Sequence, residues 1–467
     1  MFIGREKELS ILEDAYGSGR FEFLVLYGRR RIGKTSLLKE FSRHHKALLY
    51  SAQEKNDSLN LLDFSKAVQG FFEGRFFGKF SDWEAAFGYI SGKANPSERL
   101  VLIIDEFPFI AVENPSIKSI LQHTIDHDWM EKNIFLILCG SSVSFMEDEV
   151  LAHKSPLYGR STVHMELRGF DYLESSRFFP GYSSTDKITA YCILGGVPCY
   201  LAAFDASRPP VWNVASKILR EGSFLKDEPA FLLRQELREP AVYNSIFEVI
   251  AGGATRVNDI ASKIHEEPQK CSKYLRTLQA IRLVKKCTPC GEDESSRRTV
   301  YKISDNYFAF WYHFLFGQKS YYELLGEERA AAEIFLPENL NTHVGRIFED
   351  VCAEYMLRLA KAGRLPFVPA KYGRWWGGNP ERKVQDDIDV LLIDRTGQRI
   401  IICECKFRND SFGKSDFETM LSRRSVFPGA EEISFFAFSK GGFSDWVKES
   451  AEPGRVTLVG IDDLFLI

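Results

Sequence analysis

Short apolar runs recur along the first third of the chain, and stretches with helical spacing of apolar positions separate them. The runs occupy residues 21–27, 47–51, 100–104 and 134–139. Continuous apolar runs of this length, alternating with helices, are typical of a parallel sheet that helices cover on both faces. We therefore predict an α/β core over residues 1–165.

The periodicity changes near Phe170, where the strand-like runs end. Helical spacing of apolar positions continues over residues 188–204 and 211–219. This pattern predicts a helical lid over residues 166–235, which follows the α/β core.

Three helical stretches and two short strand-like runs follow, and the runs at 283–286 and 299–303 flank a charged loop. This order of elements predicts a winged helix-turn-helix over residues 240–305. The segment holds eleven Lys and Arg against eight Asp and Glu, a weakly basic balance that contact with DNA favours. The candidates for phosphate contacts are Lys270, Lys273, Arg276, Arg297 and Arg298. Winged helices also dock proteins, so the segment leaves both kinds of partner open.

Aromatic residues crowd positions 305–316. Because aromatic side chains dominate burial, a docking helix locked between domains explains them better than a stacking surface for bases. We assign residues 306–340 to an aromatic helical connector. A further helix then precedes strand-like runs at 387–393, 399–404, 433–438 and 456–459. These elements predict a second α/β domain over residues 341–467.

Composition narrows the class of protein. The 467 residues exceed one ordinary hydrophobic core, and the 45% hydrophobic and 27% charged residues are those of a soluble globular protein. No apolar run approaches the roughly 18–20 residues of a membrane span, and the charged start leaves no room for a secretory signal. Nine cysteines without framework spacing suit a reducing compartment. We expect a cytoplasmic protein with no membrane contact. Its net charge of −4 argues against coating nucleic acid indiscriminately.

A glycine-rich loop follows the first apolar run and precedes a helical stretch. It matches the phosphate-loop pattern in the residues Gly28, Arg29, Arg30, Arg31, Ile32, Gly33, Lys34 and Thr35. The glycines let backbone N–H groups and the N-terminus of the helix, which continues with Ser36, face the phosphates of ATP. We expect Lys34 to bridge the β- and γ-phosphates and the Thr35 hydroxyl to bind Mg²⁺.

The run at 101–106 is a buried-strand pattern that ends in two acids. We expect Asp105 in the Mg²⁺ shell and Glu106 as the general base that polarises the attacking water. A strand followed by a solvated acidic turn is the plain alternative. The phosphate loop and this element together favour the nucleotide site.

Two polar positions are candidates to complete that site. The run at 134–139 leads into Gly140, Ser141 and Ser142, where a sensor of the γ-phosphate is expected; either serine suits, and we take Ser141. Arg160 lies on a turn beyond it. There an arginine neutralises transition-state charge, in its own chain or across an oligomer, or else is an ordinary surface residue.

Six motifs stand in order along the chain, at residues 2–9, 27–34, 103–106, 140–142, 158–160 and 195–198. Together they resemble the archaeal-type ATPase family, which belongs to the AAA-related signal-transduction (STAND) P-loop ATPases. The resemblance implies that Arg5 lies beside the adenine and that Pro198 touches the nucleotide from the lid. Members of that family often continue through a motif like residues 305–311 into a domain of unknown function, so the resemblance covers nearly the whole chain.

The terminal domain carries acids in the order of a metal-dependent nuclease. Glu349 lies on the predicted helix, Asp389 at the start of one strand, and Glu404 and Lys406 on the next. This order is similar to the restriction-endonuclease-like PD-(D/E)XK pattern. The three carboxylates would then share Mg²⁺ with a scissile phosphate, and Lys406 would position or activate the water. A salt-bridged pair of strand ends in an α/β core is the alternative.

The motif order predicts an Mg²⁺-dependent ATPase whose nucleotide state controls how the winged helix and the nuclease-like domain act on DNA. The alternative is a nucleotide-gated signalling or scaffold module whose C-terminal domains bind partners without cleavage. A DNA-binding regulator with slow ATPase timing is a third hypothesis. An oligomer is compatible with all three.

Overall fold

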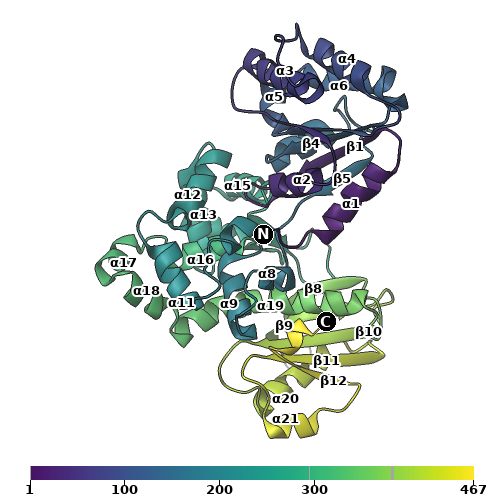
Figure 1. Cartoon of the computed structure of the whole chain (residues 1–467). Coiled ribbons are helices and arrows are strands. Elements are labelled where there is room, and N and C mark those ends of the chain that lie inside the picture. The colour runs from purple at the N-terminus through teal and green to yellow at the C-terminus, as the bar shows by residue number, and fades with distance from the viewer. Residues whose placement is uncertain (1, 294, 380–382, 467) are drawn as a thin grey trace. The chain divides into compact units, whose positions relative to one another are not determined.

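The computed structural model describes residues 2–293, 295–379 and 383–466 of the chain (Figure 1). They form two compact units. Unit 1 comprises Met1–Gly169 and Val197–Cys199, and unit 2 comprises Phe170–Gly196 and Tyr200–Ile467. Within the described residues, no helix has both the length and the apolar character that crossing a bilayer requires.

Unit 1 is built on a parallel sheet. Its strands are β1 (Glu22–Tyr27), β2 (Ala47–Ser51), β3 (Leu100–Asp105), β4 (Ile134–Gly140) and β5 (Val163–Glu166). They lie in the order β2-β3-β4-β1-β5, and all neighbours are parallel. Parallel strands end at the same edge of a sheet, so the turns after β1, β3 and β4 come together. The predicted α/β core is confirmed.

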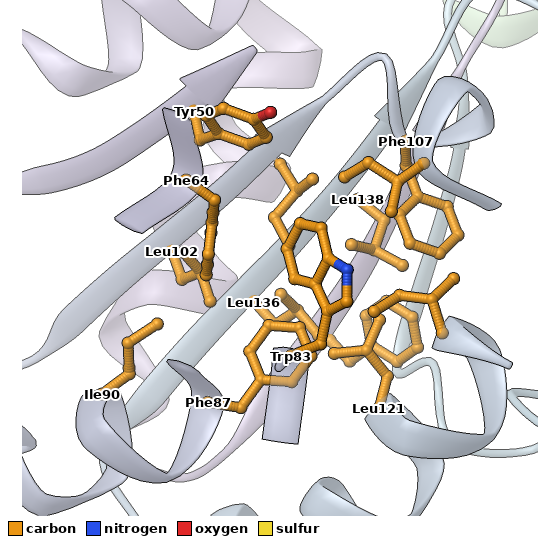
Figure 2. Packing of buried hydrophobic residues seen from close by; sticks show 14 of the residues in the cluster. Tyr50, Phe64, Trp83, Phe87, Ile90, Leu102, Phe107, Leu121, Leu136 and Leu138 are labelled. Atoms are coloured by element: carbon orange, nitrogen blue, oxygen red, sulfur yellow. The ribbon is translucent and has the colours of Figure 1, made fainter. Parts of the chain in front are cut away.

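Helices cover both faces of this sheet (Figure 1). They are α1 (Glu6–Gly17), α2 (Lys34–Ser42), α3 (Asp57–Glu73), α4 (Trp83–Lys93), α5 (Phe107–Glu113), α6 (Ile117–His127) and α7 (Val143–Phe145). Figure 2 shows Phe64 and Trp83 packed against strand residues such as Leu102. Burying one such side chain stabilises the fold by about 1.5–3 kcal/mol, so this face anchors the strands whose ends carry the acids.

The first part of unit 2 is helical. Its first segments are α8 (Tyr172–Ser176), α9 (Ser184–Leu194), α10 (Pro198–Leu201, whose first two residues belong to unit 1), α11 (Pro210–Asn213) and α12 (Phe224–Glu236). They are followed by α13 (Pro240–Ala251), α14 (Val257–Lys263), α15 (Pro268–Ala280) and an antiparallel hairpin of β6 (Val284–Cys287) and β7 (Val300–Ile303). This is the order of elements that a winged helix-turn-helix requires.

The aromatic segment forms α16 (Asn306–Phe314), and α17 (Lys319–Leu325) and α18 (Glu327–Ile334) follow it. Its aromatic side chains are buried, and Trp311 donates its indole N–H to the Lys226 carbonyl at 2.7 Å. The structure therefore supports the docking interpretation of this segment over the base-stacking one, since buried rings are inaccessible to bases.

The chain ends in a mixed sheet with helices on both faces. Its elements are α19 (Pro337–Lys361), β8 (Lys371–Asn379), β9 (Val384–Ile393), β10 (Arg399–Lys406), α20 (Lys414–Ser422), β11 (Glu432–Ser439), α21 (Asp445–Ser450) and β12 (Val456–Gly460). The strand order is β12-β11-β10-β9-β8; β9 is antiparallel to both neighbours, and β10, β11 and β12 are parallel. The predicted second α/β domain is confirmed.

Strand β8 is absent from the sequence-based prediction. Gly373 has a φ of 148°, and the pairing with β9 shifts register between Gly373 and Trp375. This bulge, in a segment rich in glycine, removes the regular alternation by which a half-buried strand is recognised.

Candidate functional site

The phosphate loop curls between β1 and α2. Gly28 and Gly33 have φ values of 153° and 96°, a range that favours glycine. A Cβ on Gly28 would overlap the carbonyl oxygen of Leu167. The sequence therefore needs glycine at this position for steric as well as conformational reasons, and the loop wraps closely against the chain after β5.

Lys34 opens α2 and is 5% exposed. Its Nζ donates to the carbonyl oxygens of Gly28 at 2.6 Å and Arg29 at 3.1 Å. Burial lowers the pKa of this ammonium, while the charges of Glu106 and Asp105 act in the opposite direction. An ammonium held inside a curled loop at a helix N-terminus is the arrangement that binds phosphate.

Thr35 and Asp105 bring two oxygen donors together. The Thr35 hydroxyl donates to Asp105 Oδ2 at 3.0 Å, and Asp105, at the end of β3, is 2% exposed. Mg²⁺ takes oxygen ligands and usually needs only one or two from the protein, because phosphate oxygens and waters supply the rest. The donor set at this point of the site therefore fits Mg²⁺ bound to a nucleotide.

Glu106 and Ser141 meet beside this pair. Glu106 has a φ of 54°, which is uncommon for a residue with a side chain. Its Oε2 accepts hydrogen bonds from the Ser141 hydroxyl at 2.8 Å and from the Ser141 N–H at 3.2 Å. The structure thus brings the candidate base and the candidate sensor into direct contact.

Arg5 contacts the phosphate loop and the segment that follows β5. It is 5% exposed, and its guanidinium donates to the carbonyl oxygens of Ile32 at 3.1 Å and Arg168 at 2.6 Å. Pro198 lies on the loop as well, because its Cγ is 3.6 Å from the position of a Cβ on Gly33. Both residues implied by the resemblance therefore lie at the loop, and their contacts with a nucleotide remain predictions.

The other loop residues differ in exposure. Ile32 is buried, Arg29 and Arg30 are half-buried, and Arg31, Thr35 and Ser36 are exposed. Arg160 lies elsewhere: it pairs with Asp126 through two hydrogen bonds of 2.8 and 2.7 Å. These two residues precede β5 and β4, at the sheet edge opposite the loop. The structure does not bring Arg160 to the phosphate loop of its own chain. A role in another subunit and the alternative of an ordinary surface arginine, here paired with Asp126, both stay open.

In the terminal domain, the structure brings Glu349 and Asp389 together. Burial, and then the negative charge of Asp389, raise the pKa of Glu349 to about 7. Burial also raises the pKa of Asp389, although its Oδ2 accepts the Cys405 N–H at 2.8 Å. Both carboxyls line one cavity, and two acids whose charges repel each other favour a bound cation or proton, although Arg374 Nη1 already lies 3.4 Å from Glu349 Oε2.

Strands β9 and β10 diverge where these acids stand. The two strands pair over residues 390–393 and 400–403. In the described part of the domain this pairing does not reach Asp389 and Glu404, while β9 continues along β8. The Asp389 side chain takes the place of a backbone partner for Cys405. The divergence leaves space beside the acids.

Glu404 has partners that the sequence does not predict. It is 1% exposed, Lys406 Nζ lies 2.5 Å from its Oε1, and the guanidinium of Arg423 contacts its other oxygen. Arg423 also lies 3.3 Å from Asp386. Among the residues that the structure describes, no group of three acidic, histidine or cysteine side chains is close enough to hold a metal ion. Glu349 and Asp389 suit Mg²⁺, whereas Glu404 is engaged by arginine.

Arg423 follows α20 in a short 3₁₀ helix, nineteen positions after Glu404, and no local pattern singles it out.

One of the residues expected to contact phosphates in the wing, Arg298, has a protein partner instead. Its guanidinium donates to the Trp376 carbonyl at 2.8 Å, so this side chain points to the terminal domain. Lys270, Lys273 and Arg276 lie on α15; Lys273 and Arg276 are exposed, and Lys270 is paired with Glu266.

Comparisons with known proteins point to the same two regions. A model of ATPase domains predominantly from Archaea matches residues 2–204, and a model described as Archaea bacterial proteins of unknown function matches residues 311–420. The chain is 32% identical over 412 residues to the uncharacterized protein MJECL04 of Methanocaldococcus jannaschii, covering 88% of each. It is 44% identical over 46 residues, 10% of this chain and 78% of the relative, to the uncharacterized ATP-binding protein MJ0423 of that organism.

Among solved structures, the Walker-type ATPase paby2304 of Pyrococcus abyssi is similar, with a TM-score of 0.52 and 20% identity. The match covers 67% of this chain and 96% of that one. At this identity, the likeness shows the fold alone.

Proposed function

Because this chain belongs to the family of ATPases found predominantly in Archaea, we propose that it binds ATP with Mg²⁺ at residues 28–35 and hydrolyses it. The observation that carries the proposal is the Thr35–Asp105 contact of 3.0 Å beside the buried Lys34. It joins the two parts of a nucleotide site that lie seventy positions apart in the sequence.

Each residue then has a distinct role. The Lys34 ammonium, now on two carbonyls, moves to the phosphate oxygens, and the loop N–H groups hold the phosphates in place. Bound Mg²⁺ supplies neutralisation of the charge that develops on the phosphates. Glu106 orients the attacking water and accepts its proton, and Ser141 fixes the direction of that carboxylate.

Replacing the loop lysine tests this proposal. Lys34→Ala is expected to abolish phosphate release from ATP, because the ammonium that bridges the β- and γ-phosphates is then lost. Lys39→Ala, at an exposed position of the same helix, is the matched control and is expected to keep turnover. Normal turnover by the Lys34 variant would refute the ATPase assignment.

For the terminal domain, we propose DNA cleavage by a metal-dependent nuclease-like centre that the nucleotide state controls. The support is the approach of Glu349 to Asp389 where β9 and β10 diverge, beside Lys406. Glu349 and Asp389 hold the cation, Lys406 positions the water, and Glu404 joins the centre when it leaves Arg423. DNA and the winged helix-turn-helix are part of this proposal and not of the family assignment.

One contact favours the alternative, in which the domain binds a partner without cleavage. The buried Arg423 guanidinium already neutralises Glu404, as a structural ion pair would. Incubating DNA with the protein in Mg²⁺ or Mn²⁺ distinguishes the two. Degradation that Lys406→Ala and Asp389→Asn both abolish supports cleavage by this centre. No degradation by the wild type, or degradation by both variants as fast as by the wild type, supports the binding module.

A further inference from the structure

The β6–β7 hairpin lies across the acids of α19. Lys285 Nζ is 2.8 Å from Asp350 Oδ2, and Lys302 Nζ is 3.9 Å from Glu349 Oε2. One lysine comes from each strand of the hairpin. The hairpin of the helix-turn-helix segment therefore forms a wall of the candidate centre in the terminal domain.

The loop of that hairpin is anchored to β8. Cys290 donates its N–H to the Arg374 carbonyl at 2.8 Å, and its side chain is 9% exposed in the core of the terminal domain. On the other side of the loop, Arg298 donates to the Trp376 carbonyl, and the Trp376 indole donates to the Arg298 carbonyl at 3.2 Å. A wing held at both ends is not available to enter a groove of duplex DNA.

A cavity of about 680 Å³ lies between the hairpin, α19 and the first strands of the terminal sheet. Its basic lining residues are Arg256, Lys285, Lys286, Lys302 and Arg374. Its acidic lining residues are Glu349, Asp350, Asp387 and Asp389. Five basic against four acidic side chains leave a slight positive charge, which a divalent cation on the acids would increase.

A smaller cavity adjoins the first one at α19. A second cavity of about 360 Å³ shares the residues Thr255, Lys302, Glu349, Asp350 and Arg374 with the first. It extends along α19 to Arg346 and His313. Glu349 and Asp350 therefore line both cavities, whereas Asp389 lines the larger one alone, and a chain-like ligand has room on both sides of Glu349.

Two aromatic side chains line the larger cavity beside the cations. Tyr372 is 56% exposed, and Trp376 is held by its bond to the wing. Basic grooves with aromatic rings bind single-stranded nucleic acid, because bases stack on the rings while cations contact the backbone. Cavities of roughly 300–1,000 Å³ hold small ligands. The volume here suits a short stretch of one strand, and the fixed hairpin stands in the way of a duplex.

We propose that these two adjoining cavities take a single strand of DNA, not a duplex, and that its backbone runs past Glu349 and Asp389. The inference rests on the proposed action of the terminal domain on DNA and specifies its substrate. The strand's phosphates contact the exposed Arg256 and Lys286, and its bases stack on Tyr372. A double-stranded segment is excluded until its end is unpaired.

Binding is measured by fluorescence anisotropy in Mg²⁺ with the full-length Lys406→Ala variant, so that no cleavage is needed. The probe is a labelled oligodeoxynucleotide of about 15 bases, within the sites of roughly 4–16 nucleotides of single-strand binders, and the same sequence as a blunt duplex. The single strand is expected to bind at least about tenfold more tightly than the duplex. Adding Arg256→Glu or Lys286→Glu is expected to weaken strand binding on the order of tenfold and to lower its salt dependence.

Lys361→Glu at the end of α19 is the matched control, since this exposed lysine lies in the terminal domain and does not line either cavity. Duplex binding as tight as strand binding, or loss of strand binding in the Lys361 variant but not in the Arg256 and Lys286 variants, would overturn the inference. Strand binding that depends on Arg256 and Lys286 supports it even where the wild type cleaves nothing. Cleavage of blunt duplex as fast as single strand, lost in Lys406→Ala, would overturn it and leave the nuclease proposal standing.

Discussion

At the scale of single residues, the Glu106 carboxylate owes its direction to one neighbour. Ser141 provides both of the hydrogen bonds that end on Glu106 Oε2. A general base contributes roughly 10²–10⁴-fold only when its carboxylate points at the water it activates. The hydroxyl of Ser141 is therefore a positioning group for the Glu106 carboxylate.

Ser141→Ala is expected to lower kcat for ATP hydrolysis by roughly tenfold and to change KM little, because it removes one of the hydrogen bonds that direct the base. Steady-state phosphate release at several ATP concentrations separates the two constants. Ser142→Ala is the matched control, since its side chain caps nothing at the start of α7. A change in KM alone would contradict a positioning role.

The half-buried Glu354 makes stability depend on pH. Burial raises its pKa to about 7, and it accepts hydrogen bonds from the Tyr172 N–H at 3.1 Å and the Tyr191 hydroxyl at 3.0 Å. The unfolded chain releases this proton near pH 4.3. Between these pH values the folded state holds a proton that the unfolded state has lost, so this group's contribution to stability falls as pH rises and is lowest above pH 7.

Glu354→Gln is expected to remove this loss. Relative to the wild type, its free energy of unfolding is expected to be higher at pH 8 by on the order of 1–3 kcal/mol and similar at pH 4. Urea unfolding at the two pH values measures the difference. Glu338→Gln, at an exposed position of the same helix, serves as the control. An equal effect of Glu354→Gln at both pH values would contradict the assigned cause.

Single residues also mark the limit of prediction from sequence. Lys34, Thr35 and Asp105 follow from the spacing of a loop and a strand end, because their backbone neighbours dictate the geometry. Arg160 and Arg423 do not, since each is placed by a carboxylate far away in the chain, Asp126 and Glu404. An ion pair formed across the fold leaves no periodic trace in the sequence.

At the scale of elements, the phosphate loop has its shape from a close approach of backbone to backbone. Gly28→Ala is expected to displace the loop, because the new Cβ would overlap the Leu167 carbonyl. The expected cost is about 1–3 kcal/mol of unfolding free energy, with loss of ATP affinity.

Gly88→Ala on α4 is the control. Nothing lies within 4 Å of the new Cβ, and this variant is expected to gain about 0.5–1 kcal/mol of unfolding free energy. Thermal unfolding and nucleotide titration measure both effects, and unchanged ATP affinity in Gly28→Ala would contradict the loop geometry.

Elements also differ in how far the sequence predicts them. Strands β1, β3 and β4 of unit 1 are buried on both faces, so continuous apolar runs mark them within a residue or two. Strand β5 is only partly buried, and the sequence-based prediction lacks it. Strand β8 combines a bulge with glycines, and it owes its place to pairing with β9 and to the wing that binds its backbone. Tertiary partners, rather than local propensity, determine such a strand.

At the scale of the whole molecule, the chain itself links the nucleotide site to unit 2. Val197–Cys199 belongs to unit 1, while the residues on both sides of it belong to unit 2. Pro198 in this segment lies against Gly33 of the phosphate loop. The chain is therefore covalently continuous from a segment beside the phosphate loop to the helices on either side of that segment.

If the nucleotide state controls the terminal region, ATP and ADP must change its affinity for DNA. We expect single-stranded DNA to bind the Glu106→Gln variant with ATP and with ADP at affinities that differ about 5–150-fold, the usual range of coupling. Linkage then requires DNA to change the ratio of ATP and ADP affinities by the same factor. Lys34→Ala is expected to abolish the difference, because it removes the group that senses the phosphates. Equal DNA affinity in both nucleotide states, measured by anisotropy with saturating nucleotide, would separate the two activities and leave an ATPase joined to an independently acting domain.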